Sequence, residues 1–144
     1  MDAQIVVAGA LFSAAGLLVA QRQRPPELAG LWELPGGKVA AGESDADALA
    51  RELREELGVE VSVGDRLGVD VALKAGMTLR AYRATLTSGS PQPHDHRELR
   101  WVTADELDAL AWVPADRAWL PDLAEVLSRP SGPPQAEGAP SESA

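Results

Sequence analysis

Three glutamates, Glu52, Glu55 and Glu56, lie close together in the segment ARELREELG, whose composition is that of a helix. At about 100° per residue all three fall on one arc, beside an aliphatic arc that would face a core. Like charges at this spacing cost roughly 0.2–0.5 kcal/mol per pair, and Arg51 cannot neutralise all of them. A divalent cation such as Mg²⁺ would relieve the repulsion, because it takes carboxylate oxygens and completes its shell with waters and phosphates. The alternative interpretation is a solvated acidic surface.

The overall composition limits the class of protein. The chain has 144 residues, enough for one domain, and its lack of cysteine excludes disulfides and thiolate metal sites. A net charge of -9 argues against a protein that binds nucleic acid polymers or anionic membranes through its own charge. The apolar run 5–20 has no basic residue before it and is interrupted by Ser13 and Gly16. We therefore expect two core strands there rather than a signal or an anchor, and a cytoplasmic protein by default.

The acidic helix has recognisable ends. Ser44 is a good N-cap and Gly58 a good stop, so a helix is expected over 46–57. A last helix is expected at about 116–127, with Pro121 kinking it or delaying its start. A turn is expected at 35–37.

Alternating apolar residues indicate a sheet, so the elements together predict an α/β domain over residues 1–129. The expected strands are 4–12, 17–22, 31–34, 99–102 and parts of 59–87. Residues 130–144 are rich in Pro, Ser and Gly with almost nothing apolar, and are expected to be disordered.

The spacing around the acidic helix matches a known motif. From Gly37 the chain follows G-x5-E-x7-R-E-U-x-E-E-x-G-U without departure, where U is aliphatic and the first acid is Glu43. This is the Nudix box, and the chain resembles the Nudix hydrolase family. From Gln4 to about Leu127 it is similar to the small MutT-type branch. The resemblance implies an α/β/α sandwich with a central mixed β-sheet.

The resemblance also implies a chemistry and a set of residues. Nudix hydrolases direct water at a nucleoside diphosphate linked to another group, with Mg²⁺ as the cofactor and Mn²⁺ as a substitute. Glu52, Glu55 and Glu56 are then catalytic and hold the metal, with Glu52 near the attacking water. The carbonyl of Gly37 is a further metal ligand.

Two cations and one acid outside the motif extend this site by the same resemblance. Arg22 and Lys38 occupy positions where MutT-like enzymes contact phosphates. Arg22 could instead be an ordinary surface cation at a strand end. Glu33, in WELPGG, lies where the branch often has an acid beside the metal, and could also form a structural ion pair.

A polar loop, 88–98, supplies another acid. In MutT-like proteins this loop adds a carboxylate to the metal site, and Asp95 is the matching residue, with Glu98 as a rival. His94 and His96 flank Asp95 and suggest zinc, but no further ligand is visible in the loop.

The segment WVPADRAWL, 112–120, carries the expected base-reading residue, Asp116. MutT-like enzymes have an Asn here in the 8-oxo-guanine sanitiser. An ionised carboxylate only accepts hydrogen bonds, which favours an amino group such as cytosine N4. A carboxylate can also read the N2 amino group or N7 hydrogen of 8-oxo-guanine, and Asp116 could merely cap the last helix. Trp32, Trp112 and Trp119 could stack on a base or pack in the core.

We therefore expect an Mg²⁺-dependent pyrophosphohydrolase that converts a nucleoside triphosphate to the monophosphate and pyrophosphate. The PAD sequence resembles bacterial CTP-type enzymes, so CTP, dCTP and 5-methyl-dCTP are the expected substrates. An 8-oxo-dGTP diphosphatase on the same scaffold is the alternative, and a nucleotide sensor without hydrolysis is an alternative of another class. The expected partner is the nucleotide alone, bound by a monomer or homodimer.

Overall fold

The computed structural model describes residues 4–129 and has a mixed seven-stranded sheet at its centre. The strand order is β3-β2-β1-β6-β5, with β4 paired to β1 and β7 to β2. β1 and β6 run parallel, and the other pairs are antiparallel. The strands are β1 (Gln4–Ser13), β2 (Gly16–Gln21), β3 (Trp32–Glu33), β4 (Gly36–Lys38), β5 (Glu60–Ala72), β6 (Met77–Ser88) and β7 (Glu98–Val102).

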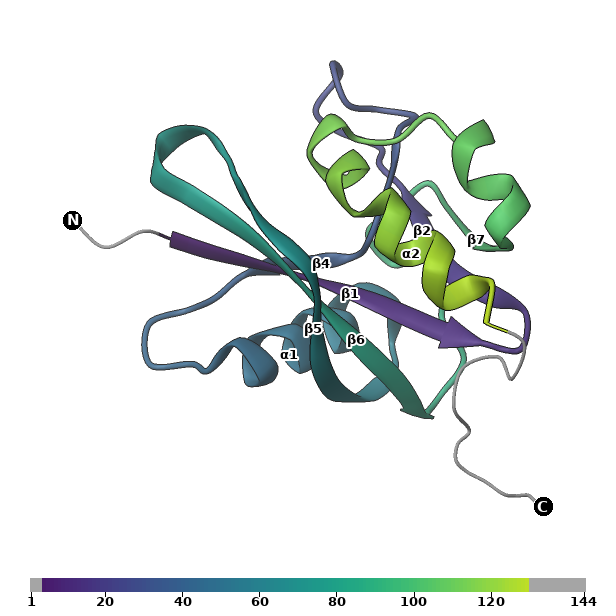
Figure 1. Ribbon diagram of the computed structural model, residues 1–144. Coiled ribbons are helices and arrows are strands. Elements are labelled where there is room, and N and C mark those ends of the chain that lie inside the picture. The colour runs from purple at the N-terminus through teal and green to yellow at the C-terminus, as the bar shows by residue number, and fades with distance from the viewer. Residues whose placement is uncertain (1–3, 130–144) are drawn as a thin grey trace.

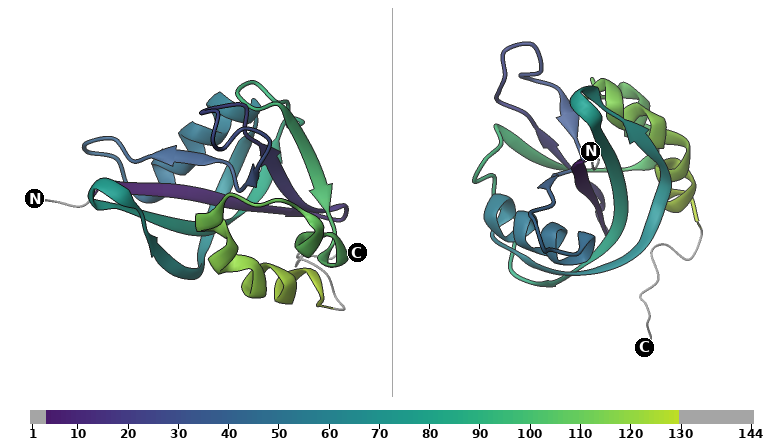
Figure 2. Two further views of the ribbon diagram at one scale, coloured as in Figure 1. Left: turned by 90° about the horizontal axis from the view of Figure 1, so that it is seen from above. Right: turned by 90° about the vertical axis from the view of Figure 1, so that its left-hand side faces the viewer.

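Helices cover both faces of the sheet (Figure 1, Figure 2). Helix α1 (Asp45–Leu57) lies on one face, and the 3₁₀ helix η3 (Pro114–Trp119) with helix α2 (Leu120–Leu127) lies on the other. Two further 3₁₀ helices, η1 (Lys74–Gly76) and η2 (Ala104–Ala109), connect strands and helices. No helix within residues 4–129 has the length and apolarity needed to cross a membrane.

The sheet separates two apolar cores. Alternate residues of β1 supply both, with Val7 and Leu11 on the α1 side and Ala8 and Ala10 on the α2 side. This two-sided burial explains why the sequence of β1 is almost continuously apolar. The expected α/β/α arrangement with a mixed sheet is therefore confirmed.

Helix α1 ends where the sequence indicates. The Ser44 hydroxyl accepts a hydrogen bond from the Asp47 N–H at 3.0 Å, and Gly58 ends the helix in the left-handed conformation. Buried Leu49 and Leu53 fasten the helix to the sheet. The glutamates lie on the arc beside this core-facing one.

Two local expectations need correction. Residues 36–38 form strand β4, where a turn was expected, because glycines without side chains let this backbone pair closely with β1. The last helix does not begin at residue 116: a 3₁₀ helix precedes it, and Pro121 lies in the first turn of α2. The proline therefore delays the helix and does not kink it. The expected disorder of 130–144 concerns residues outside the described range and stays a prediction.

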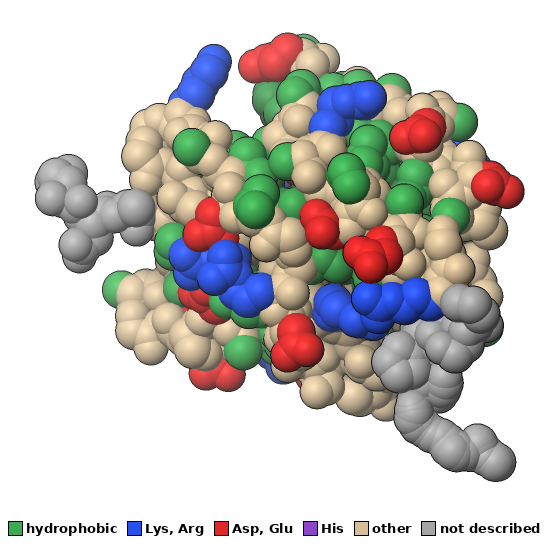
Figure 3. Space-filling view, in the orientation of Figure 1, with side chains coloured by type: hydrophobic (Ala, Val, Ile, Leu, Met, Phe, Trp, Pro, Cys, Tyr) green, Lys and Arg blue, Asp and Glu red, His purple; other side chains and the backbone are tan. Residues whose placement is uncertain are grey.

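Charges of opposite sign alternate on the outer surface of the β5–β6 side. Basic and acidic side chains interleave across the view in Figure 3. Asp70 on β5 pairs with Arg66 and with Arg80 on β6. Arg80 also pairs with Asp45 at the start of α1, at 3.0 Å, which ties the helix to the sheet. The Arg80–Asp45 pair thus adds a polar contact between helix α1 and the sheet.

Candidate active site

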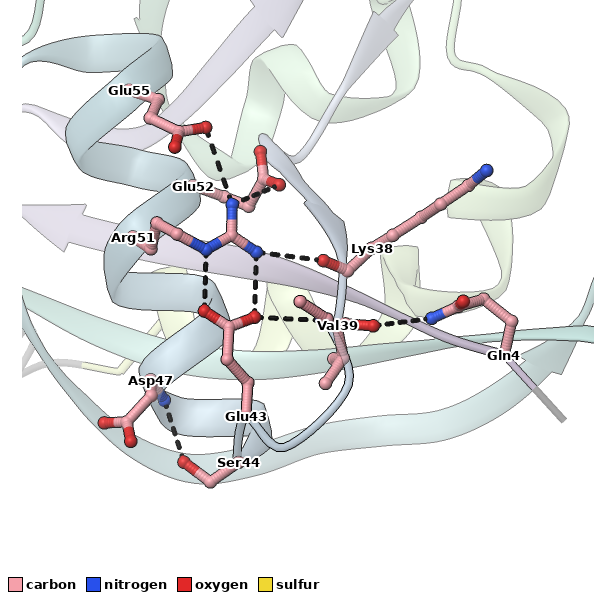
Figure 4. Close-up of polar contacts among 10 residues, drawn as sticks. Gln4, Lys38, Val39, Glu43, Ser44, Asp47, Arg51, Glu52 and Glu55 are labelled. Atoms are coloured by element: carbon pink, nitrogen blue, oxygen red, sulfur yellow. Dashed lines mark hydrogen bonds and ion pairs between the residues drawn. The ribbon is translucent and has the colours of Figure 1, made fainter. Parts of the chain in front are cut away.

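Arg51 organises the acidic motif (Figure 4). Its guanidinium forms two hydrogen bonds with Glu43, at 2.6 and 2.9 Å, and one with Glu52 at 3.0 Å. Glu55 lies 3.5 Å away, and the Lys38 carbonyl accepts a further bond at 3.1 Å. The Arg51 hydrogen bonds, with a smaller contribution from a backbone N–H, lower the pKa of Glu43 to about 2. Arg51 therefore joins the loop before α1, the helix and β4 into one unit.

The three glutamates do not converge on one point. Glu52 and Glu56 line a polar cavity of about 220 Å³, together with Arg22, Arg24, Glu33 and Asp95. Glu55 faces Arg51 outside this cavity, and 60% of its side chain is exposed. The helix thus presents two of its three predicted ligands to the cavity.

Glu56 carries the clearest electrostatic signal in the cavity. Burial raises its pKa to about 9, with further contributions from Glu52, then Glu33 and Asp95. Its Oε1 atom is buried and has no hydrogen-bond partner among residues 4–129. Negative charge in this cavity is therefore under-compensated by the described side chains.

Hard oxygen donors of this kind fit a divalent cation. Within residues 4–129 no three His, Cys, Asp or Glu side chains lie together at metal-binding distances. However, the Glu56 oxygen is buried without a hydrogen-bond partner among the described residues, in a cavity that it shares with Glu52, Glu33 and Asp95, so a cation there would meet oxygen donors. Glu52 and Glu56 are the residues that would hold the cation, because carboxylates suit Mg²⁺.

Gly37 lies directly against the Glu52 carboxylate. A Cβ atom added at Gly37 would be 2.3 Å from the Glu52 Cδ atom. Only glycine therefore leaves room for the carboxylate beside the β4 backbone. The predicted role of the Gly37 carbonyl as a metal ligand remains a prediction, but its backbone is at the right place, on the wall of the polar cavity.

The two glycines of β4 are expected to respond differently to alanine. Gly37→Ala must displace only the flexible end of Glu52, so we expect about a tenfold to 100-fold loss of kcat/KM with little change in Tm. Gly36→Ala would place Cβ 1.9 Å from the Val7 carbonyl oxygen, a backbone atom that cannot move without breaking the sheet. We expect a loss of about 3 kcal/mol or more in the free energy of unfolding. Chemical denaturation and steady-state kinetics on both variants check this, and equal loss of stability in the two would contradict it.

Asp95 of the polar loop reaches the polar cavity, whereas Glu98, the alternative acid, does not. Asp95 lines the cavity and pairs with Arg24 at 2.5 Å. Glu98, at the start of β7, is not among the cavity residues. The two histidines contact different neighbours. His94 is exposed and lies against Gly58, whereas His96 is buried and contacts Glu33. The residues described here thus do not gather the ligands of a zinc site.

Arg22 lies between the polar cavity and a second pocket. Its Nη1 atom donates to Glu33 Oε1 at 2.9 Å, so Glu33 does form an ion pair. Arg22 lines both cavities, whereas Lys38 lines only the second. Phosphates that extend from one cavity to the other would meet both cations.

The second pocket is larger and mainly apolar. Its volume is about 400 Å³, and it shares Arg22, Glu33, Gly36 and Gly37 with the polar cavity. Its apolar walls include Val6, Leu28, Leu34, Leu73, Met77 and Leu79. An apolar pocket with one buried acid, next to a charged cavity, suits a nucleobase joined to phosphates.

Asp116 is that acid. It is 4% exposed, and its Oδ2 atom accepts a hydrogen bond from the Leu34 N–H at 2.8 Å. Burial raises its pKa to about 8, partly opposed by the Leu34 N–H. Neither η3 nor α2 has a side-chain cap, so the capping interpretation is wrong. The raised pKa favours the protonated form, which donates as well as accepts, and this weakens the acceptor-only argument for cytosine.

The tryptophans pack in the core. Trp32, Trp112 and Trp119 are at most 7% exposed and belong to the core on the α2 side of the sheet. Trp112 donates to the Leu107 carbonyl at 2.7 Å, and Trp119 to the Val69 carbonyl at 2.8 Å. None of the three lines either pocket. Their rings therefore serve packing and not base stacking.

The site contains the residue types that the motif implies, and a comparison with protein families matches residues 2–123 to the NUDIX domain. The chain belongs to the Nudix family. It is a Nudix hydrolase, an enzyme that acts on phosphoric anhydrides, and Nudix hydrolases generally use divalent metal ions.

Its relatives differ in their named substrates. A Mycobacterium tuberculosis protein named "Putative 8-oxo-dGTP diphosphatase 2" is 63% identical over 128 residues, covering 87% of this chain and 91% of the relative. The CTP pyrophosphohydrolase of Escherichia coli is 39% identical over 113 residues, covering 77% and 84%. The solution structure of the E. coli ORF135 protein superposes with a TM-score of 0.76 at 34% identity, covering 91% of this Nudix chain and 96% of that one.

Proposed function

We propose that the protein is an Mg²⁺-dependent 8-oxo-dGTP diphosphatase that produces 8-oxo-dGMP and pyrophosphate. The observation that carries this proposal is the pair of adjoining cavities, one polar with Glu52 and Glu56 and one apolar with Asp116. The similarity to the M. tuberculosis relative, at 63% identity, favours 8-oxo-dGTP over a cytidine nucleotide. The cytidine preference expected from the sequence thus gives way to its alternative.

The chemistry of Asp116 is compatible with this base. A protonated carboxyl group offers one donor beside one acceptor. The edge of 8-oxo-guanine with N7–H and O6 offers the complementary pair, whereas unoxidised guanine presents two acceptors there. Guanine would therefore leave one Asp116 oxygen facing an acceptor. The mismatch costs about as much as an unpaired buried polar group, ~1–3 kcal/mol.

Hydrolysis follows from the placement of the phosphates. A water oxygen attacks one phosphorus of the triphosphate, the anhydride bond at that phosphorus breaks, and pyrophosphate separates from the monophosphate. A cation held by Glu52 and Glu56 would neutralise charge at the phosphoryl oxygens and lower the pKa of the water. Arg22 and Lys38 orient the phosphates at the boundary of the cavities, and Asp116 holds the base.

The second candidate is CTP pyrophosphohydrolase, because of the E. coli relative and because cytosine N4–H and N3 also form a donor beside an acceptor. A comparison of kcat/KM for 8-oxo-dGTP, dGTP, CTP, dCTP and 5-methyl-dCTP, with Mg²⁺ and with chelator, separates the two. We expect 8-oxo-dGTP to exceed dGTP by about tenfold to 100-fold, with activity lost on chelation. A preference for the cytidine compounds would replace the proposed substrate. Binding without turnover in Mg²⁺ or Mn²⁺ would instead support a nucleotide sensor.

A further inference from the structure

His96 is a buried polar residue that the proposed reaction does not use. It is 7% exposed and lines the polar cavity. Its segment is fixed on both sides, because the His94 N–H donates to the Glu56 carbonyl at 3.1 Å and the Arg97 N–H to the Gln21 carbonyl at 2.9 Å. The backbone on both sides of His96 is thus held, by the end of α1 and by the end of β2.

Glu33 connects His96 to Arg22. One Glu33 oxygen lies 3.0 Å from His96 Nε2, and the other accepts from Arg22 Nη1 at 2.9 Å. An ionised carboxylate only accepts hydrogen bonds, so the Nε2 atom of His96 is the donor. Each oxygen of the Glu33 carboxylate is therefore fixed, one by His96 and the other by Arg22.

Arg22 in turn has a limited choice of orientation. Besides its bond to Glu33, its Nε atom donates to the Arg24 carbonyl at 3.0 Å. A guanidinium has five N–H donors, so Arg22 keeps further donors for a ligand, and it lines both cavities. A planar guanidinium that is held in a fixed orientation binds phosphate oxygens better than a mobile one.

We propose that His96 is a positioning residue for phosphate binding: through Glu33 it holds Arg22 in the orientation that meets the phosphates of the substrate. The inference rests on the proposed function, because a nucleotide must lie across the two cavities for Arg22 to contact its phosphates. Without the His96 donor, the Glu33 carboxylate loses one of its two anchors, and Arg22 loses its fixed partner. Loss of a hydrogen bond that orients a metal ligand typically costs about tenfold to 100-fold in activity, and we expect a loss towards the lower end of this range for a group that orients a phosphate-binding arginine.

Three variants separate positioning from packing. His96→Leu keeps an apolar body but removes the donor, whereas His96→Gln retains an amide N–H with similar reach. His94→Gln is the matched control, because His94 is exposed on the same loop and lines neither cavity. We expect His96→Leu to lower kcat/KM about tenfold, His96→Gln to restore it to within about threefold, and the control to leave it unchanged.

A double-mutant cycle with Arg22→Met tests the connection. If His96 acts through Arg22, His96→Leu will have less than about a twofold effect in the Arg22→Met background. An undiminished effect there, or a His96→Gln variant that is folded but as impaired as His96→Leu, would overturn the inference.

The cycle also works if the proposed substrate is wrong. If the wild type prefers a cytidine nucleotide, the same kinetics are measured on that nucleotide. If no nucleotide is hydrolysed, the Kd of inorganic pyrophosphate, measured by calorimetry in the four proteins of the cycle, replaces kcat/KM. Failure of the proposed function then appears in the wild type, and failure of the inference appears as additive effects in the cycle.

Discussion

Glu52→Gln is expected to lower kcat/KM by about 10³-fold or more, which corresponds to a loss of ~4 kcal/mol of transition-state stabilisation. Glu52 lines the polar cavity and lies against Gly37. The amide keeps the shape and still accepts the hydrogen bond from Arg51, but it removes the negative charge that would hold the cation. Because the three other acceptors around Arg51 remain, Tm should change by only a few degrees.

Three further Glu→Gln variants show whether the loss of activity is specific to the glutamates of the cavity. Glu56→Gln should match Glu52→Gln, because Glu56 is the other helix carboxylate in the cavity. Glu55→Gln should lose less than about tenfold, because a mostly exposed carboxylate is strongly screened. Glu125→Gln, the same change on an exposed position of α2, controls for the substitution itself. Kinetics and thermal unfolding of the four variants measure this.

Wild-type-like activity in Glu52→Gln would remove that residue from the reaction. Equal losses in Glu52, Glu55 and Glu56 would support the assignment of all three by family resemblance. Glu55 would then have to leave Arg51 and turn towards the cavity when the cation binds, and the arrangement in Figure 4 would be that of the free enzyme.

The sequence predicts the elements that its local signals define. Ser44 and Gly58 set the ends of α1 because their effects act within one turn of the helix. Pro121 similarly determines where α2 begins. Strand β4 was missed because two glycines, which usually indicate a turn, serve here to bring two backbones together. The position of Gly36 opposite Ala8 is a tertiary fact that no local pattern contains.

The residue types of the site could be predicted from the sequence, but the contacts among their side chains could be predicted less well. Pairing of Arg51 with Glu43, eight positions away, depends on the path of a loop and cannot be inferred from the spacing within the helix. The contribution of His96 also depends on a tertiary contact with Glu33, and the flanking acid in the sequence suggested a metal ligand instead. The ionisation of Asp116 could not be foreseen either, because its pKa is set by burial.

Asp116 is expected to control both base recognition and the pH dependence of stability. Asp116→Leu removes the buried acid of the apolar pocket and leaves the buried Leu34 N–H without its partner. We expect about a 10³-fold loss of kcat/KM, since sites that hydrogen-bond a substrate lose heavily when the pairing fails, and a loss of ~1–3 kcal/mol in the free energy of unfolding. Asp116→Asn keeps an acceptor for Leu34 and adds a donor, so it should resemble the protonated wild type below pH 8.

Comparison of Asp116→Asn with the wild type also isolates the effect of Asp116 titration on stability. The pKa of Asp116 rises from 3.8 to about 8 on folding, so between these values the folded state holds a proton that the unfolded state has released. Wild-type stability therefore falls as pH rises through this window, by about 1.4 kcal/mol per pH unit from this group. Asp116→Asn lacks this loss, whereas the contribution of Glu56 is common to both proteins and cancels in their difference.

The difference in Tm between Asp116→Asn and wild type should thus grow from pH 5 to pH 8 and level off above it. Thermal unfolding at several pH values measures it, and the ratio of 8-oxo-dGTP to CTP hydrolysis is recorded on the same samples. At pH 9 the wild-type carboxylate accepts only, so its substrate ratio should depart from that of the Asn variant. A constant difference in Tm would show that Asp116 is ionised in the folded protein, and an unchanged substrate ratio in the variant would exclude it from base recognition.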